Sequence, residues 1–121
     1  MEDLTKKQCL PCDSGLAPLA EEKIQEFLPQ VPGWKLTEGV TAKGKRHLML
    51  TREFKFGDFM PAVNFVNRVA AVAEAEGHHP DIYIYYNRVR LDLWTHAITG
   101  LFDNDFIIAA KINKILEEKV N

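Results

Sequence analysis

The stretch of sequence that decides the fold is residues 58–96, DFMPAVNFVNRVAAVAEAEGHHPDIYIYYNRVRLDLWTH. Its first half repeats apolar residues at helical spacing, whereas its second half is rich in the β-branched and aromatic residues that favour strands. Asp58 can cap the start of the helix, and Gly77 can end it in the left-handed conformation. The pattern therefore predicts a helix over residues 58–76 that is followed by a β-hairpin.

The hairpin is expected to consist of strands over residues 82–86 and 89–96. Asn87 and Arg88 can form the tight turn between them, because asparagine tolerates left-handed backbone geometry. Side chains alternate between the two faces of a strand, so His96 is expected at the strand end, on the less aliphatic face.

A similar arrangement of a helix and two strands precedes this stretch. The other expected elements are a short helix after Pro18, strands over 34–38 and 47–54, and a final helix after Asp103. Short loops between strands favour antiparallel pairing, and amphipathic helices between hairpins favour packing on one side of a sheet. The sequence thus predicts an α+β fold with two layers: a four-stranded antiparallel sheet with helices packed on one face, in the order helix-β-β-helix-β-β-helix. The other face of the sheet is left to solvent or to another subunit.

Length and composition indicate one domain. The chain has 121 residues, of which 46% are hydrophobic, enough to bury the core of a single domain. Turn-forming residues near the N-terminus suggest a mobile or loosely packed arm over residues 1–17, and the domain is expected over residues 18–121.

Charge and hydropathy narrow the classes of partner. The net charge is −2, with 15 basic and 17 acidic residues, and no basic block suggests binding to nucleic acid or to an anionic membrane. The apolar runs are far shorter than the roughly 20 residues that span a bilayer, and the N-terminus does not resemble a signal peptide. We therefore expect a cytoplasmic protein that binds a small molecule or another protein.

Cys9 and Cys12 form a Cys-Leu-Pro-Cys step. A redox motif of this spacing should follow a buried strand and open a helix, and a structural zinc site would need two further ligands. Neither condition is met by the neighbouring sequence, so we interpret the pair as ordinary reduced thiols.

Three of the four histidines, His78, His79 and His96, lie within nineteen residues. Imidazole exchanges protons near neutral pH and also binds metal ions, so the cluster indicates proton transfer or a metal site. The specific alternative to proton transfer is a zinc site with three histidine ligands, although two adjacent histidines do not easily bind the same ion. His47 lies outside the cluster, and we interpret it as a surface residue.

The order and spacing of seven residues resemble the pterin-4a-carbinolamine dehydratase family, whose members are also known as dimerisation cofactors. The residues are Glu74, His78, His79, Pro80, Tyr86, His96 and Asp105. The resemblance implies dehydration of a 4a-hydroxytetrahydropterin, such as 4a-hydroxytetrahydrobiopterin, to quinonoid dihydropterin without a metal or a cofactor. It also implies a place in tetrahydrobiopterin recycling beside an aromatic amino-acid hydroxylase, and assembly as a homodimer or homotetramer. The alternative is a protein-binding module that acts as a dimerisation cofactor or transcriptional coactivator.

The resemblance also suggests roles for individual residues. His78 and His96 are candidates for the acid and base pair, and His79 for orienting the pterin ring. Further candidates for contact with the substrate are Trp34, Glu74, Pro80, Thr95, Ala97 and Ile98. The chain departs from some family members at Asn104, where those members carry an arginine that helps to hold the substrate, so we expect weaker or differently oriented binding.

Overall fold

The computed structural model of the chain describes residues 3–10 and 17–117. Four strands form one antiparallel sheet in the order β1-β2-β4-β3. The strands are β1 (Lys35–Val40), β2 (Arg46–Lys55), β3 (Asp81–Tyr85) and β4 (Arg88–Leu93). The α-helices are α1 (Glu21–Phe27), α2 (Phe59–Glu76) and α3 (Asp103–Glu117), and the short 3-10 helices are η1 (Leu4–Lys6), η2 (Leu28–Gln30) and η3 (His96–Ile98).

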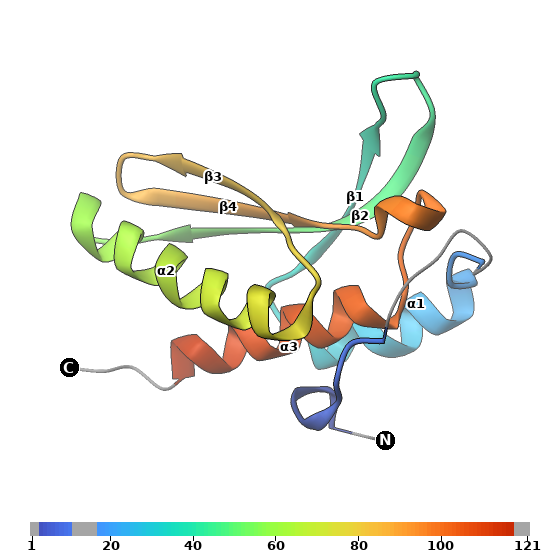
Figure 1. Cartoon of the computed structure of the whole chain (residues 1–121), viewed down its shortest axis with the longest axis horizontal. Coiled ribbons are helices and arrows are strands. Elements are labelled where there is room, and N and C mark those ends of the chain that lie inside the picture. The colour runs from blue at the N-terminus through green and yellow to red at the C-terminus, as the bar shows by residue number, and fades with distance from the viewer. Residues whose placement is uncertain (1–2, 11–16, 118–121) are drawn as a thin grey trace.

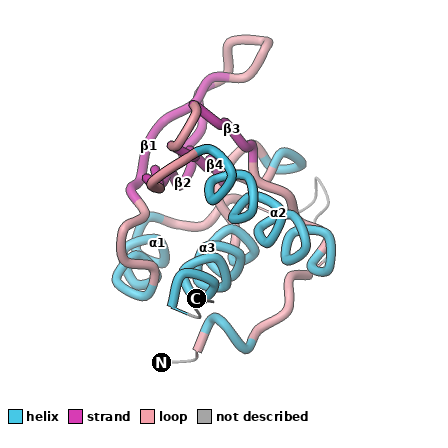
Figure 2. Tube along the Cα trace, turned by 90° about the vertical axis from the view of Figure 1, so that its left-hand side faces the viewer, coloured by secondary structure: helices cyan, strands magenta, loops and turns pink. Residues whose placement is uncertain are grey.

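The helices lie on one side of the sheet, so the molecule has two layers (Figures 1 and 2). This confirms the predicted α+β architecture with a four-stranded antiparallel sheet. The opposite face of the sheet carries no α-helix in the described part of the chain. No described helix has both the length and the apolar character that a membrane span requires.

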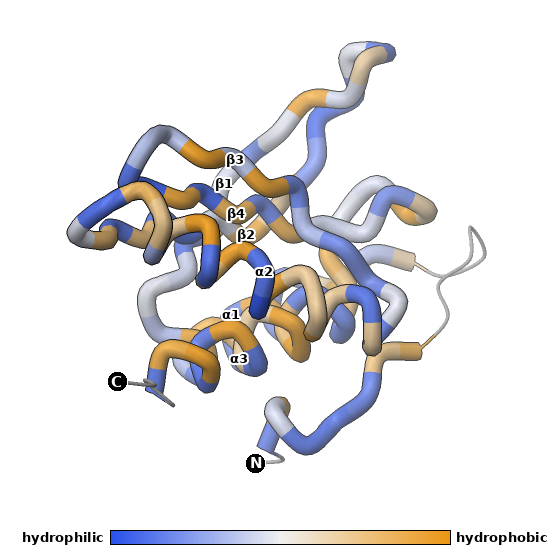
Figure 3. Tube along the Cα trace, turned by 60° about the vertical axis from the view of Figure 1, so that its left-hand side comes forward, coloured by the Kyte–Doolittle hydropathy of each residue, from blue (hydrophilic) through white to orange (hydrophobic). Residues whose placement is uncertain are grey.

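The core lies between the sheet and the helices, where the apolar stretches of both layers meet (Figure 3). Alternate residues of β2 and β4 point into it, and α3 supplies most of the opposing surface. The fully buried members of the core include Leu50, Leu91, Leu93, Phe106, Ile108 and Ile112. Burial of each such side chain stabilises the fold by about 1.5–3 kcal/mol, which fixes α3 beneath the strands.

Helix α2 has the two caps that the sequence predicts. Asp58 Oδ1 accepts a hydrogen bond of 2.9 Å from the backbone N–H of Phe59. Gly77 ends the helix with a φ of 69°, in the left-handed region that glycine adopts at little cost. Because the chain leaves the helix at Gly77, the next two residues, His78 and His79, stand at the junction between α2 and β3.

The β3–β4 hairpin differs from the prediction in two places. The left-handed residue of its turn is Tyr86, with a φ of 56°, and not Asn87. Tertiary contacts hold Tyr86 there, because its hydroxyl donates to Asp58 and its ring stacks on Phe59. The second strand ends at Leu93, before the predicted end at residue 96.

His96 therefore lies in η3 and not in a strand. The pair of backbone hydrogen bonds between Thr95 and Gly100 closes a loop at this point. Thr99 follows η3 with a φ of 49°. This tight loop brings His96 back beside Trp94.

Residues 3–10, which we call the N-terminal segment, pack against the helical layer. Leu4 is buried in the core beside α3. The backbone of Leu10 bonds to Asn104, and the backbone N–H of Cys9 donates to Glu76. Residues 3–10 thus have specific contacts with the helical layer, whereas the arm over residues 1–17 and the domain boundary at residue 18 stay predictions.

Candidate active site

The three clustered histidines line one hollow, although they come from two separate elements. The hollow has a volume of about 270 Å³ and is lined by Gly77, His78, His79, Trp94, Thr95, His96 and Ala97. His78 and His79 reach it from the junction after α2, and His96 reaches it from η3. The fold thus brings together the histidines that were predicted from the sequence as candidates for catalysis.

His78 is held by a buried carboxylate. Its Nε2 lies 2.6 Å from Asp105 Oδ1, and the Asp105 side chain is fully buried. The other oxygen, Oδ2, accepts hydrogen bonds from Thr95 Oγ1 at 2.8 Å and from the backbone N–H of Phe102 at 3.0 Å. An ionised carboxylate can only accept, so the Nε2 of His78 carries a proton and Nδ1 is the nitrogen that can accept one.

His79 has a different environment. Its Nε2 lies 2.7 Å from Glu74 Oε1, but the side chains are 59% and 80% exposed. Water screens such a pair, which contributes about 0–1 kcal/mol to stability. The contact can orient the ring of His79 without locking it.

His96 is supported by an aromatic face. Its ring stacks on the indole of Trp94, with the centroids 3.9 Å apart and the planes at 22°. The opposite face of the same indole carries His47, at 3.7 Å and 15°. The sequence interpretation set His47 aside as a surface residue and was wrong, because the side chain is buried.

Little in the sequence indicates that His47 belongs to the site. The alternation of residues along its strand predicts that His47 lies on the face without helices, and only the tertiary structure shows that Trp94 stacks on it. Asp105, in contrast, is one of the seven residues whose spacing resembles the dehydratase family, although it was not among the predicted site residues.

Some predicted contact residues lie apart from the hollow. Trp34 is buried in the core, where its Nε1 donates to Asn113 and its ring packs against Phe54. Pro80 and Ile98 are buried beside the histidines but do not line the hollow of this chain. Thr95 and Ala97 line it.

Asn104 and Cys9 belong to the contact with the N-terminal segment. Asn104 is buried, and its amide bonds the N–H and the C=O of Leu10 at 2.9 and 2.6 Å. Asn104 therefore does not line the hollow, and the weaker substrate binding that we expect from it stays a prediction.

Burial, and then the charge of Glu76, raise the pKa of the Cys9 thiol to about 12, which disfavours the reactive thiolate. Cys12 lies outside the described residues.

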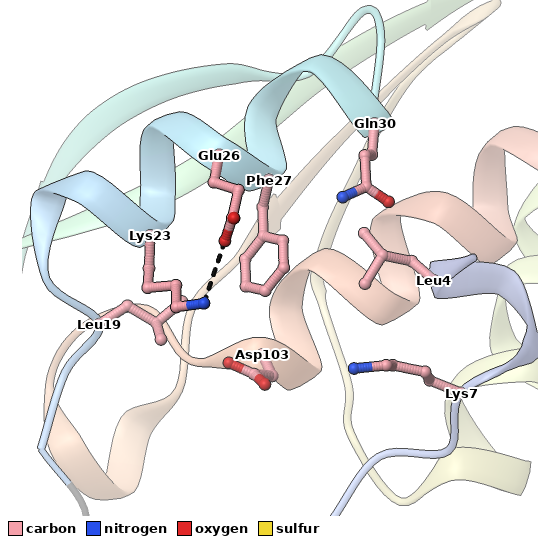
Figure 4. Close-up of a pocket in the computed structure, with 8 residues that line it drawn as sticks. All are labelled: Leu4, Lys7, Leu19, Lys23, Glu26, Phe27, Gln30 and Asp103. Carbon is pink, nitrogen blue, oxygen red and sulfur yellow. Dashed lines mark hydrogen bonds and ion pairs between the residues drawn. The ribbon is translucent and has the colours of Figure 1, made fainter. Parts of the chain in front are cut away.

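A larger hollow lies between η1, α1 and the start of α3 (Figure 4). Its volume is about 560 Å³, and an ion pair between Lys23 and Glu26 spans part of it. Its lining contains no histidine. The three clustered histidines are in the smaller hollow.

The described residues also bear on the metal alternative. Within residues 3–10 and 17–117, no three His, Cys, Asp or Glu side chains are grouped so that they could hold one ion. The imidazoles of the hollow instead have carboxylate and aromatic partners.

The fold and the hollow define a class: a small α+β protein with a histidine site at the junction of a helix and a sheet. A family model described as pterin 4 alpha carbinolamine dehydratase matches residues 17–115. The chain belongs to this family.

Individual relatives agree with this assignment. A Methylococcus capsulatus protein that carries the pterin-4-alpha-carbinolamine dehydratase name is 44% identical over 115 residues, covering 95% of each chain. Pterin-4-alpha-carbinolamine dehydratase 2, mitochondrial, of Arabidopsis thaliana is 42% identical over 98% of this chain and 62% of that protein. A solved structure of a transcriptional coactivator/pterin dehydratase from Brucella melitensis is 36% identical and has a TM-score of 0.70. It covers 81% of this chain and 97% of the other. The predicted family, and with it a dehydratase of the lyase class, is confirmed.

Proposed function

We propose that the chain dehydrates 4a-hydroxytetrahydropterins, with 4a-hydroxytetrahydrobiopterin as the representative substrate, by histidine acid and base catalysis. The observation that carries the proposal is the convergence of His78, His79 and His96 on one hollow, in a chain of the dehydratase family. The products are quinonoid dihydropterin and water.

The chemistry needs two proton transfers. The hydroxyl at the ring junction must be protonated as it leaves as water, and a proton must be lost from a ring nitrogen so that the new double bond forms. His78 and His96 are the proposed pair, with either order of roles. The buried Asp105 orients His78, much as a carboxylate orients the histidine in other catalytic groups.

His79 is proposed to orient and bind the pterin ring, since its exposed pair with Glu74 leaves the imidazole free to turn toward a ligand. Thr95 and Ala97 form part of the proposed contact surface. Pro80 and Ile98 are buried, so any part that they play is proposed to be indirect. Trp34 lies in the core of this chain, so any part that it plays is proposed to be indirect.

The test is turnover of a freshly prepared 4a-hydroxytetrahydropterin, followed by its loss of absorbance relative to the spontaneous reaction. We expect the wild-type chain to accelerate the loss, and His78→Ala and His96→Ala each to lower kcat by about 100-fold or more. For His79→Ala we expect the larger effect on KM. Asn67→Ala, on the exposed side of α2, is the matched control and should retain the wild-type rate.

Failure of the wild-type chain to accelerate the reaction would refute the proposal, as would full activity of His78→Ala. The metal-dependent alternative makes a separate prediction. If elemental analysis finds a stoichiometric metal whose removal abolishes turnover, the metal-free mechanism is wrong.

A protein-binding role is the second candidate, because the Brucella relative carries a coactivator name. Such a role would use another surface and would be compatible with dehydratase activity. It predicts a stable complex that survives His78→Ala in a pull-down. Absence of any such complex would count against it.

The proposed reaction also implies a place beside an aromatic amino-acid hydroxylase, since hydroxylases of this class release the 4a-hydroxylated pterin. Together they would recycle tetrahydrobiopterin in the cytoplasm. Co-expression with such a hydroxylase should shorten the lifetime of the hydroxylated pterin, and an unchanged lifetime would contradict the pathway assignment.

A further inference from the structure

His47, Trp94 and His96 form a stack of three rings from three parts of the chain. His47 comes from β2, Trp94 follows β4, and His96 opens η3. Both imidazole centroids lie within stacking distance of the same indole centroid, at 3.7 and 3.9 Å. Two rings that close to one centroid would collide on a single face, so they occupy opposite faces of Trp94.

Stacking on Trp94 holds the ring of His96. Among the described residues, His78 and His79 each have a carboxylate partner, whereas the ring of His96 has no hydrogen bond or ion pair. His96 is also exposed and stands on a single 3-10 turn. The face of Trp94 is therefore the contact that sets the plane of its imidazole.

The indole is in turn fixed on its other sides. Its Nε1 donates to Asp81 Oδ2 at 3.3 Å. The face opposite His96 is covered by the buried ring of His47, whose Nδ1 lies 3.2 Å from the carbonyl oxygen of Leu48. Removal of His47 would take away the ring that stacks on that face of the indole.

The sequence of β1 is adapted to this arrangement. Gly39 pairs with His47 across the β1–β2 ladder. A Cβ atom at Gly39 would lie 2.6 Å from Cε1 and 2.8 Å from Nε2 of the His47 ring, closer than these atoms can approach. Glycine within a strand marks such a close approach, so Gly39 provides the space in which His47 lies flat.

We propose that His47 is a positioning residue for His96 and acts through the indole of Trp94. The inference rests on the proposed function, since it assigns a purpose to a fixed His96. The ring of His47 keeps Trp94 in place, and Trp94 keeps the imidazole of His96 aimed into the hollow. Small displacements of an acid or base lower the rate of the chemical step with little effect on substrate binding.

Two variants remove the support in different ways. His47→Ala deletes the ring, and Gly39→Ala displaces it without altering any residue of the hollow. For each we expect kcat to fall by about 10-fold while KM stays within about 2-fold. His47→Phe keeps a flat ring and should recover most of the loss. Gly57→Ala is the matched control, because a Cβ atom there meets nothing within 4 Å, and it should retain the wild-type rate.

A second measurement follows the geometry without using activity. The ring protons of His96 lie over the indole, whose ring current shifts their NMR signals; loss of one signal set in His96→Gln assigns them. In His47→Ala and Gly39→Ala we expect these signals to move toward the values of free histidine, and in His47→Phe to stay near the wild-type positions. Thermal unfolding of each variant reports any general loss of stability.

The outcomes separate this proposal from the proposed function. Unchanged His96 signals in His47→Ala overturn the positioning role, whatever the rate. Moved signals with an unchanged kcat also overturn it, because the position of His96 would then not matter to the reaction. If the wild-type chain has no dehydratase activity, the proposed function fails, and the NMR signals alone decide whether His47 positions His96.

Discussion

Asp105 illustrates how one buried residue organises the site. Its two oxygens serve different partners: Oδ1 holds His78, and Oδ2 accepts from Thr95 and from the backbone of Phe102. A buried carboxylate is costly unless its hydrogen-bonding capacity is used, and here three donors use it. The position of His78 is therefore coupled to the start of α3 and to the residue beside His96.

We predict that Asp105→Asn lowers kcat by about 10- to 100-fold with little change in KM. An amide can accept the two bonds from Thr95 and Phe102 only by turning its NH2 group toward His78, which would then need the opposite tautomer. Steady-state kinetics measure the effect. Asp103→Asn, two residues earlier in α3, should behave as the wild type; an equal loss in both variants would contradict the specific role of Asp105.

At the scale of elements, the N-terminal segment is attached to the helical layer by polar contacts as well as by Leu4. Asn104 bonds both backbone groups of Leu10, and Glu76 accepts from the N–H of Cys9 while pairing with Lys111 at 2.6 Å. These contacts join the segment to α2 and α3, the helices that carry the site at their ends.

We predict that Asn104→Ala destabilises the chain by about 1–3 kcal/mol, because the buried amide of Asn104 makes two hydrogen bonds to the backbone of Leu10 that the variant loses. Chemical denaturation measures the loss. Asn67→Ala on the exposed face of α2 is the control and should be neutral or slightly stabilising, since alanine favours helix. Equal stability of the two variants would show that the bonds between Asn104 and Leu10 do not contribute to the fold.

The Glu76 contact predicts a dependence of stability on pH. Burial would raise the pKa of Glu76, but the hydrogen bond and charge of Lys111 and the N–H of Cys9 outweigh it, so the pKa lies below the ordinary value of 4.5. A lowered folded-state pKa gives stability that is present above pH 4.5 and is lost as the pH falls through the folded value. Glu76→Gln should therefore be less stable than the wild type at pH 7, with a free energy of unfolding lower by about 1–2 kcal/mol and a correspondingly lower Tm. The difference should shrink on acidification below pH 4.5, and a constant difference would refute this account.

At the scale of the whole molecule, β3 forms one edge of the sheet and is largely exposed. Its exposed large side chains are Ile82, Tyr83, Ile84 and Tyr85. An open edge with apolar side chains is a surface on which a second strand can pair. This agrees with the homodimer or homotetramer that the family resemblance implies.

We predict that light scattering at micromolar concentration gives a mass of two or four chains of 13.8 kDa each. A charge on an edge strand opposes pairing, so Ile84→Lys should shift the mass toward that of one chain. Lys43→Ala, in the β1–β2 loop, should leave it unchanged. A wild-type monomer at this concentration would contradict the prediction of self-association.

The sequence by itself determined the order of elements, the caps of α2 at Asp58 and Gly77, and the spacing of the histidines. These features depend on local propensities and on periodicity, which can be read along the chain. The family was also evident from this spacing, because adjacent histidines before a proline form a narrow pattern.

Only the tertiary structure decided which residues meet. Tyr86, in the left-handed turn position, donates its hydroxyl to Asp58, and Trp34 packs in the core, where Asn113 accepts its buried N–H. His47 joins the site because the pairing of β2 with β4 and the loop at η3 bring it to the far face of Trp94. Such contacts join residues that are distant in the chain, so their geometry is set by packing and strand register and leaves no local pattern in the sequence.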